Sequence, residues 1–372
     1  MNATQLQNAW LNAKTGETIE LDQDIGRVTL KKSKRAKGSP QVTIKLNGKI
    51  ISRDPEVGSS DTFQLKSGVR DLIIDGQGAL LLAASRSGIK TEGPGGARKV
   101  WLKDMTVNGG WNVNENNKPP PNKWLAHHYL TGSWIESGMY YTGCADEHAR
   151  YFHNLQGNHF FSGNDITWCG RTALQIVNRV KEVDTMMPQG YGDVTVEDET
   201  VVDVCLEQGG GGSAYTFRGG MPSSTITMKR VSVRLGCDAA LHKDLQGRAT
   251  GALLMDSGPE SNPGAGDMAW PGGTAALRCY DQDYEVGTVY PGVGSAKRPC
   301  VKVGAVKLFT WTDGRIKVPA GETALEIQHS CETFMWSGKP EVVGKVRYKG
   351  QIYDEWDDFT SAHPECSMAA GS

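Results

Sequence analysis

Apolar and polar residues follow short-period patterns along most of the chain. Brief runs of Val, Ile, Leu and Met recur and are broken by Gly and Asn, for example at 42–44, 72–74, 100–102, 194–196 and 226–228. Short runs bounded by such residues are typical of strands. Beyond the N-terminus no segment shows a long helical period. The pattern therefore predicts a mainly β protein.

The N-terminus differs from the rest because its apolar residues recur at helical spacing. These residues are Leu6, Ala9, Trp10 and Ala13. Asn2 is placed to cap such a helix with Gln5 three residues on, and Gly16 is placed to end it. Residues 17–21 then alternate like a strand. We expect a short amphipathic helix that covers the open end of a stack of strands.

A repeated pattern indicates how the strands are arranged. A strand ends near Cys169, Cys205 and Cys237, and each is followed by a small residue, Ala, a large apolar residue and a polar one; the repeats span 166–176, 202–217 and 233–242. Variants recur at 251–253 and 323–327. Repeats at intervals of roughly 35 residues are typical of solenoids, in which like residues stack to form a continuous core. The three Cys are expected to stack inside, paired or unpaired.

This repeat divides the chain into four parts. Residues 1–20 are expected to form the cap helix and first strand, and residues 21–250 a parallel β-helix. Residues 251–350 are expected to form further coils or a β-rich C-terminal module, and residues 351–372 a tail. The Asn- and Pro-rich stretch 109–123 is expected to leave the coil as a surface loop.

The repeated segments resemble a known family. Asn158 to Arg179 and Tyr191 to Arg230 are similar to the coils of the pectate-lyase-like superfamily of right-handed parallel β-helices, and the helix–Gly–strand opening is similar to its N-terminal cap. The resemblance covers roughly residues 1–250 and is strongest to phage tailspike and other virion β-helix proteins. It implies an all-β, right-handed, single-stranded parallel β-helix, a carbohydrate-binding groove and a homotrimer. None of the diagnostic catalytic strings of pectate lyases or polygalacturonases is present.

Charge and composition exclude several classes of function. The formal net charge is −2, and the only dense basic run, Lys31 to Lys37, fits a solvated coil edge. No nucleic-acid partner is therefore expected. No run approaches the roughly 20 apolar residues of a membrane-spanning helix, so membrane insertion is not expected either. The eight Cys include no close pair, which argues against a zinc ribbon.

Two acids are the candidate catalytic residues. Hydrolysis of a glycoside needs two carboxylates about 5 to 9.5 Å apart, and equivalent positions in adjacent coils lie about 4.8 Å apart. Glu207 and Asp238 follow Cys205 and Cys237 by two and one positions. His242 occupies the outward slot of the following strand. These three residues are the predicted catalytic group, and a salt-bridged solvent face is the alternative.

The same alignment places candidate substrate-binding residues beside the acids. Arg171 follows Cys169, Gln175 occupies the outward slot with Thr216, and Arg179 and Arg218 follow that slot. A lyase needs a base and a group that neutralises the uronate, often Arg. These side chains are therefore predicted to bind an acidic sugar.

Aromatic residues near the long loop are further candidates for binding sugar. Trp111, Trp124 and Trp134 lie in or near it, beside Tyr140 and Tyr141. Sugar rings stack on such side chains at little entropic cost. Packing of the loop onto the coil is the alternative.

No cofactor is expected. The segment 144–148, near His127, His128 and His153, contains Cys and His but is better explained as a polar loop. Asp281, Asp283 and Glu285 precede Gly287 like an incomplete calcium loop; calcium there is the one alternative left open.

Three functions fit these features. The first is a phage tailspike-like virion protein that binds, or binds and depolymerises, a host cell-surface polysaccharide as a homotrimer, alone or with other virion proteins. The second is a secreted bacterial polysaccharide lyase or glycoside hydrolase. The third is a structural virion protein without a glycan site. The expected location is the virion or, for the second function, the extracellular space, because Met1 is followed by polar residues rather than by a secretion leader.

Overall fold

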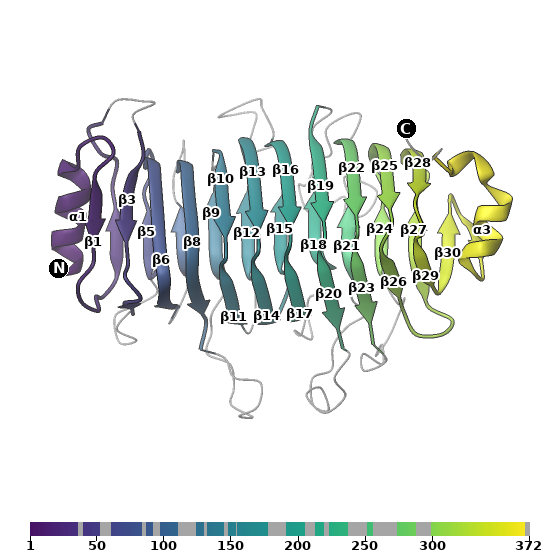
Figure 1. The fold of residues 1–372 in the computed structure, drawn as a ribbon, viewed down its shortest axis with the longest axis horizontal. Coiled ribbons are helices and arrows are strands. Elements are labelled where there is room, and N and C mark those ends of the chain that lie inside the picture. The colour runs from purple at the N-terminus through teal and green to yellow at the C-terminus, as the bar shows by residue number, and fades with distance from the viewer. Residues whose placement is uncertain are drawn as a thin grey trace, which may run out of the picture.

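Short strands stack in parallel along one long axis in the computed structural model (Figure 1). The structure describes residues 1–35, 40–52, 61–83, 87–91, 97–110, 124–129, 132–144, 148–153, 155–177, 191–204, 213–218, 223–236, 251–255, 274–287 and 299–368. Among them no helix is long and apolar enough to cross a membrane.

The described strands form two sheets. Sheet A has 19 strands: β1 (Thr18–Glu20), β3 (Val42–Lys45), β4 (Ile50–Ile51), β6 (Arg70–Leu82), β8 (Arg98–Asn108), β10 (Trp134–Ser137), β11 (Tyr140–Cys144), β13 (Gly157–Ser162), β14 (Asp165–Cys169), β16 (Tyr191–Glu197), β17 (Thr200–Val204), β19 (Thr225–Lys229), β20 (Ser232–Leu235), β22 (Thr274–Tyr280), β23 (Asp283–Val286), β25 (Val306–Thr312), β26 (Arg315–Lys317), β28 (Cys331–Ser337) and β29 (Glu341–Val343). Sheet B has 12 strands: β2 (Val28–Leu30), β5 (Phe63–Leu65), β7 (Ser87–Thr91), β9 (Trp124–Tyr129), β12 (Arg150–His153), β15 (Leu174–Val177), β18 (Ser213–Arg218), β21 (Gly251–Met255), β24 (Val301–Val303), β27 (Thr323–Ile327), β30 (Lys345–Tyr348) and β31 (Gln351–Tyr353).

Each coil contributes two strands to sheet A and then one to sheet B. β13, β14 and β15 form one such coil, and they pair in parallel with β16, β17 and β18 of the next. The coil is right-handed, as parallel crossovers almost always are. The predicted right-handed parallel β-helix is thus confirmed.

A repeated sharp turn joins the two strands that each coil contributes to sheet A. The residue at this turn has a left-handed backbone, with φ between 49° and 73°, at Asp104, Gly138, Gly163, Asp198, Arg230, Asp281, Asp313 and Gly338. Gly and Asp tolerate this conformation best. Most coils need this backbone conformation at the same turn, which explains why Gly or Asp so often separates the short apolar runs of the sequence.

Small side chains line the opposite corner, where the chain enters sheet B. Ala149, Ala173, Ala214, Ala252 and Ala324 each precede the first large inward residue of a sheet B strand, and all are fully buried. The small–Ala–large pattern of the sequence therefore marks coils at 172–174, 213–215, 251–253 and 323–325.

The predicted stack of Cys169, Cys205 and Cys237 is not confirmed. Cys169 is instead in register with Cys144, on β14 and β11, and both side chains are buried. The next position along this row is Val204, so the expected alignment of Cys205 with Cys169 is wrong. Trp168 and Asp203 both adopt left-handed backbone conformations, and the register places them opposite each other. The observed register therefore differs by one residue from the alignment on the Cys, and the repeat alone does not reveal this.

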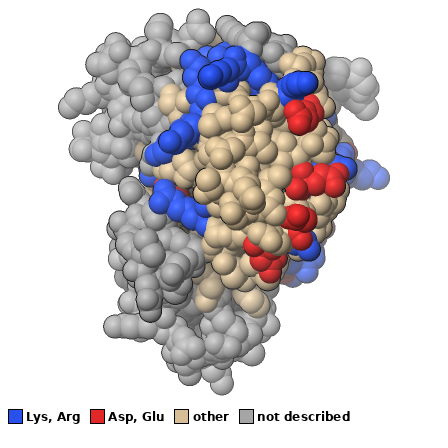
Figure 2. All heavy atoms as spheres, turned by 90° about the vertical axis from the view of Figure 1, so that its left-hand side faces the viewer, with Lys and Arg blue, Asp and Glu red and all other residues tan. Residues whose placement is uncertain are grey.

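The predicted cap helix covers the N-terminal end. In α1 (Ala3–Asn12), Asn2 and Gln5 form a reciprocal capping box, and Trp10 is fully buried. The indole Nε1 of Trp10 donates to the carbonyl of Lys31 at 2.6 Å, and the Arg35 guanidinium lies 4.2 Å from its ring centroid. Figure 2, which looks onto this end, shows Lys and Arg along one edge, and Asp and Glu interspersed with further Lys or Arg along the opposite one.

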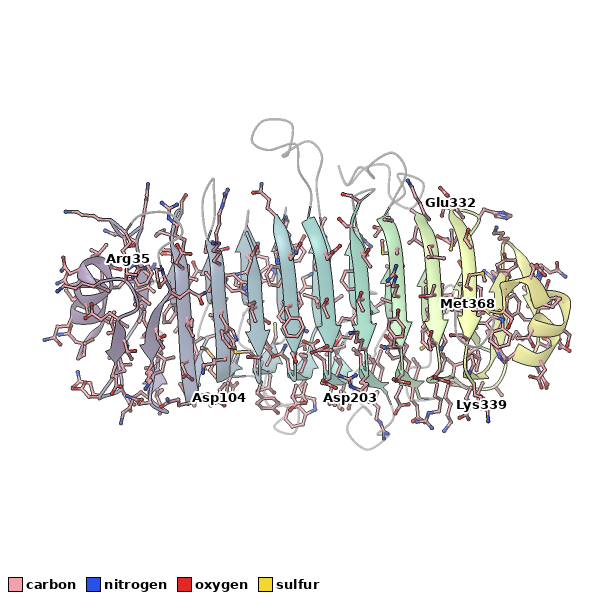
Figure 3. The ribbon with its side chains drawn as sticks, turned by 45° about the horizontal axis from the view of Figure 1, so that its top comes forward. Arg35, Asp104, Asp203, Glu332, Lys339 and Met368 are labelled. Carbon is pink, nitrogen blue, oxygen red and sulfur yellow. The ribbon has the colours of Figure 1, made fainter. Side chains whose placement is uncertain are left out.

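Coils continue to the C-terminal end without a separate β module. β30 is the last strand of the parallel stack, and β31 folds back antiparallel to it. The helix α3 (Trp356–Ala362) and a short 3-10 helix (Pro364–Cys366) follow, so the expected tail is structured. Phe359 of α3 is fully buried, and Met368 N donates to the carbonyl of Trp336 on β28 (Figure 3).

Candidate functional site

The outer face of sheet B carries a continuous row of side chains in register. Inward neighbours such as Phe152, Ile176 and Phe217 are fully buried, so alternation places the residues between them outside. The row consists of Gln64, Lys90, His127, Tyr151, Gln175, Thr216, Leu254, Lys302, Glu326 and Arg347. Long connections precede or follow several of these strands in sequence. Five members of this row are buried, namely Gln64, Lys90, Thr216, Leu254 and Glu326, so a ligand would meet only the other five.

Aromatic and imidazole rings gather at the middle of this row, on β9 and β12. The rings of His127 and Tyr151 stack with centroids 5.6 Å apart, and His148, just before β12, stacks on Tyr151 at 4.8 Å. His153 meets Tyr151 edge-on at 4.1 Å. Trp124 lies 4.5 Å from His127. We call these five side chains the ring cluster; Trp124, His127 and Tyr151 are half-buried.

Two arginines give the ring cluster a positive surrounding. Burial holds the pKa of His148 well below its usual value, and the charges of Arg171 and Arg218 lower it further. His148 is therefore neutral at neutral pH. Its Nδ1 lies within hydrogen-bond distance of the Thr172 hydroxyl, which orients the ring. The described members of this site include imidazole, phenol, indole and guanidinium groups but no carboxylate.

A buried ionic network lies beneath the ring cluster, inside the coil. Arg150, the residue before Tyr151, points inward and pairs with both carboxylate oxygens of Glu199 at 2.7 and 2.8 Å. Glu136 lies 3.4 Å from the same guanidinium. The Tyr215 hydroxyl donates to Glu199 at 2.7 Å. All four side chains are shielded from solvent, so the network fixes the strand that carries Tyr151 rather than contacting a ligand.

The structure locates five of the ten predicted site residues. Gln175 and Arg218 lie on the outer face of sheet B, Arg171 lies close to His148, and Trp124 belongs to the ring cluster. Trp134 was expected to be exposed, but it is fully buried and donates to Glu136 inside the coil, so that expectation is wrong. The other five lie outside the described residues: Glu207, Asp238, His242, Arg179 and Trp111.

The observed register also corrects the predicted grouping of these residues. The strand after β18 is β21, and its Leu254 occupies the slot predicted for His242. Arg218 is in register with Val177, not with Arg179. Asp203, at the lower edge of the sheets in Figure 3, accepts from Gly236 N at 3.0 Å. The expected outward pairing of Gln175 with Thr216 is confirmed.

Metal ligation finds no support within the part of the chain that the structure describes. No group of three His, Cys, Asp or Glu side chains there has the arrangement of a metal site. Asp283 and Glu285 of the suspected calcium loop lie on β23 and bind cations instead: Arg315 donates to Asp283 at 2.9 Å, and Lys317 to Glu285 at 2.9 Å.

The sequence prediction missed four members of the ring cluster as site residues. His127, His148 and His153 were noted only as a weak metal candidate, and Tyr151 not at all. For Tyr151 and His153 the signal is the alternation in 149–153, where Phe152 marks the inward face. The same alternation turns Arg150 inward and Tyr151 outward.

Comparison with solved structures gives two matches, both at low sequence identity. An alginate lyase from Paenibacillus sp. str. FPU-7 is 13% identical over 94% of this chain and 96% of that chain, with a TM-score of 0.40. A mutant tailspike protein of E. coli bacteriophage HK620, in complex with a pentasaccharide, is 11% identical over 94% of this chain and 74% of that chain, with a TM-score of 0.25. No protein-family model and no curated protein sequence matches. The chain is thus a parallel β-helix protein by its own strand register, and its function is argued from its site.

Proposed function

We propose that this protein binds an acidic polysaccharide along the outer face of sheet B and cleaves it by β-elimination. The observation that carries the proposal is the ring cluster with Arg171 and Arg218 beside it. Arginine binds carboxylates well, and imidazole and phenol are the groups that move protons in such a reaction. Glycoside hydrolysis, in contrast, uses two carboxylates, and the ring cluster with Arg171 and Arg218 contains none.

The reaction would divide among these side chains. Arg171 and Arg218 would bind the uronate carboxylate and so stabilise the charge that develops when the adjacent C5–H bond breaks. The neutral imidazole of His148 would take that proton. The C4–O4 bond then breaks, a C4=C5 double bond forms, and the Tyr151 hydroxyl protonates the leaving O4.

Substrate binding would itself prepare the base. The charges of Arg171 and Arg218 contribute to the low pKa of His148 in the free protein. A bound carboxylate offsets those charges, so the pKa of His148 should rise towards its ordinary value. The imidazole would become a better proton acceptor only when a uronate is in place. A neutral polymer would lack this effect, which predicts selectivity for acidic glycans.

The first prediction concerns Tyr151 and His148. Tyr151→Phe removes only a hydroxyl and His148→Asn removes the imidazole, so each should lower turnover on an acidic polysaccharide by at least about a hundredfold. Lys307→Ala removes an exposed cation on β25 of sheet A, outside this row, and is the matched control that should retain full activity. The ultraviolet absorbance of the unsaturated product measures the rate, and circular dichroism checks folding. Full activity in both variants would refute the assignment.

Two other results would favour the alternatives. New reducing ends without a C=C bond would indicate hydrolysis, and Glu207→Gln and Asp238→Asn would then test the acids that lie outside the described residues. Binding to a glycan without cleavage, by wild type and variants alike, would identify a recognition module.

For its biological setting we propose a phage virion, where the protein would act on a host cell-surface polysaccharide as a homotrimer. The long lateral faces of a single β-helix, against which two further copies could pack, support this proposal. A trimeric mass by light scattering at micromolar concentration is expected. A monomer would favour a secreted bacterial enzyme, and a trimer that neither binds nor cleaves any glycan would favour a structural virion protein.

A further inference from the structure

A second polar site lies on the outer face of sheet A, on the adjacent strands β19 and β22. An open depression of about 470 Å³ is lined by Thr227, Lys229, Arg278 and Tyr280. Thr227 is in register with Arg278, and Lys229 with Tyr280, so the four side chains form two neighbouring pairs. Their strands turn their other side chains into the core.

The two cations of this depression have no acidic partner among the described residues. Glu197 is in register with Lys229 on β16 but forms no ion pair with it. The neighbouring Arg230, in contrast, donates to both carboxylate oxygens of Asp198, at 2.6 and 2.9 Å. Lys229 and Arg278 instead leave uncompensated positive charge on adjacent strands.

The chemistry of the lining selects an anion attached to a hydroxyl-rich body. Guanidinium and ammonium groups bind a carboxylate or sulfate. The Thr227 and Tyr280 hydroxyls can exchange hydrogen bonds with sugar hydroxyls, and the Tyr280 ring offers an apolar face. The row through Thr227 and Arg278 continues along the coil axis at about 4.8 Å per strand, similar to the length of one pyranose unit in an extended chain.

From these features we infer that the depression is an accessory binding site for an anionic group of an acidic polysaccharide. It lies on a different sheet from the ring cluster and would hold a second stretch of polymer without cleaving it. The inference rests on the proposed function only for the choice of ligand. An accessory site should raise affinity for long chains and leave the turnover of short ones unchanged, because a short oligosaccharide cannot reach both faces.

The test compares two double variants with equal loss of charge. Lys229→Ala/Arg278→Ala removes the cations of the depression. Lys307→Ala/Lys339→Ala removes two exposed cations elsewhere and serves as the control. Titration calorimetry with polygalacturonate, and separately with dextran sulfate, distinguishes carboxylate from sulfate as the bound group. The first variant should lose about tenfold or more in affinity for at least one polymer, with weaker salt dependence, and the control should lose little.

The outcomes separate this inference from the proposed function. Unchanged polymer affinity in Lys229→Ala/Arg278→Ala would overturn the inference and leave cleavage at sheet B untouched. Affinity that depends on these two residues, in a protein that cleaves nothing, would uphold the inference while the proposed function fails. An equal loss of affinity for duplex DNA would show a general anion patch and overturn the glycan assignment. A change in molecular mass would place the depression in a subunit contact and overturn it as well.

Discussion

At the scale of single residues, the least expected feature is the group of charges inside the coil. Three charged side chains are buried from solvent there: two carboxylates, Glu136 and Glu199, face one guanidinium, that of Arg150. Glu199 holds the bidentate pair with Arg150. Burial raises the pKa of Glu136, so this carboxyl takes up a proton more readily than an exposed one. A proton on Glu136 would leave the group neutral.

The second prediction follows from this shift. The pKa of Glu136 in the folded state lies above its ordinary value of 4.5, so the folded protein binds more protons than the unfolded one above pH 4.5. Glu136 therefore lowers stability as the pH rises through that window. The Gln side chain of Glu136→Gln does not titrate. The difference between the free energy of unfolding of this variant and that of wild type should therefore grow in favour of the variant from pH 4.5 upward. Urea unfolding over a pH series measures the difference.

Two variants control this experiment. Glu20→Gln removes an exposed charge and should follow the wild-type pH dependence closely. Glu199→Gln breaks the bidentate pair and leaves Arg150 poorly compensated, which should cost about 3 to 5 kcal/mol. A Glu136→Gln curve parallel to wild type at every pH would contradict the assigned proton.

At the scale of elements, the sequence predicted local structure better than register. The Asn2 cap, the helix over Trp10 and the Ala at each corner are local signals, and the structure confirms them. The third repeat was misplaced because 239–242 and 251–254 carry the same small–Ala–Leu pattern. Only the course of the connecting chain decides which of them enters sheet B, and that course has no short-range signal.

The candidate site was harder to predict for the same reason. Its residues come from β9, β12 and the segments before β15 and at the end of β18, which only the stacking brings together. Alternation fixes which side of the sheet each residue faces but not its partner in the next coil. Arg171 and Arg218 were predicted because they follow the repeat. His148 was not, because it lies outside the three aligned repeats.

The third prediction concerns the turn row between the two strands of sheet A. Gly163 has φ +60°, and a Cβ placed there would come no closer than 3.9 Å to other atoms. Gly163→Ala therefore adds backbone strain without a clash, and should lower stability by about 0.5 to 1.5 kcal/mol. Gly26→Ala, whose Cβ also has room but whose φ is not in the left-handed range, should be neutral or slightly stabilising. Equal midpoints of urea unfolding for the two variants would contradict this account of the turn.

At the scale of the whole molecule, each coil contacts mainly its two neighbours, as in other solenoids. Only the two end coils would expose apolar interior, and each is covered by a helix, α1 at one end and α3 at the other (Figure 1). The caps should therefore stabilise their own ends strongly and the centre weakly. The ring cluster on β9 and β12 lies several coils from either cap and is sheltered from fraying at both.

The fourth prediction tests this one-dimensional behaviour. Trp10→Ala removes a fully buried indole, its hydrogen bond to Lys31 and its contact with Arg35, and should cost about 3 to 5 kcal/mol at that end. Amide hydrogen exchange should then accelerate in β1 to β3 while protection in β12 and β15 persists. Phe359→Ala, which removes a fully buried ring from α3, should show the mirror pattern in β28 to β31. Uniform loss of protection along the chain in either variant would mean that the β-helix unfolds as one unit. Cleavage at the ring cluster would then depend on both caps.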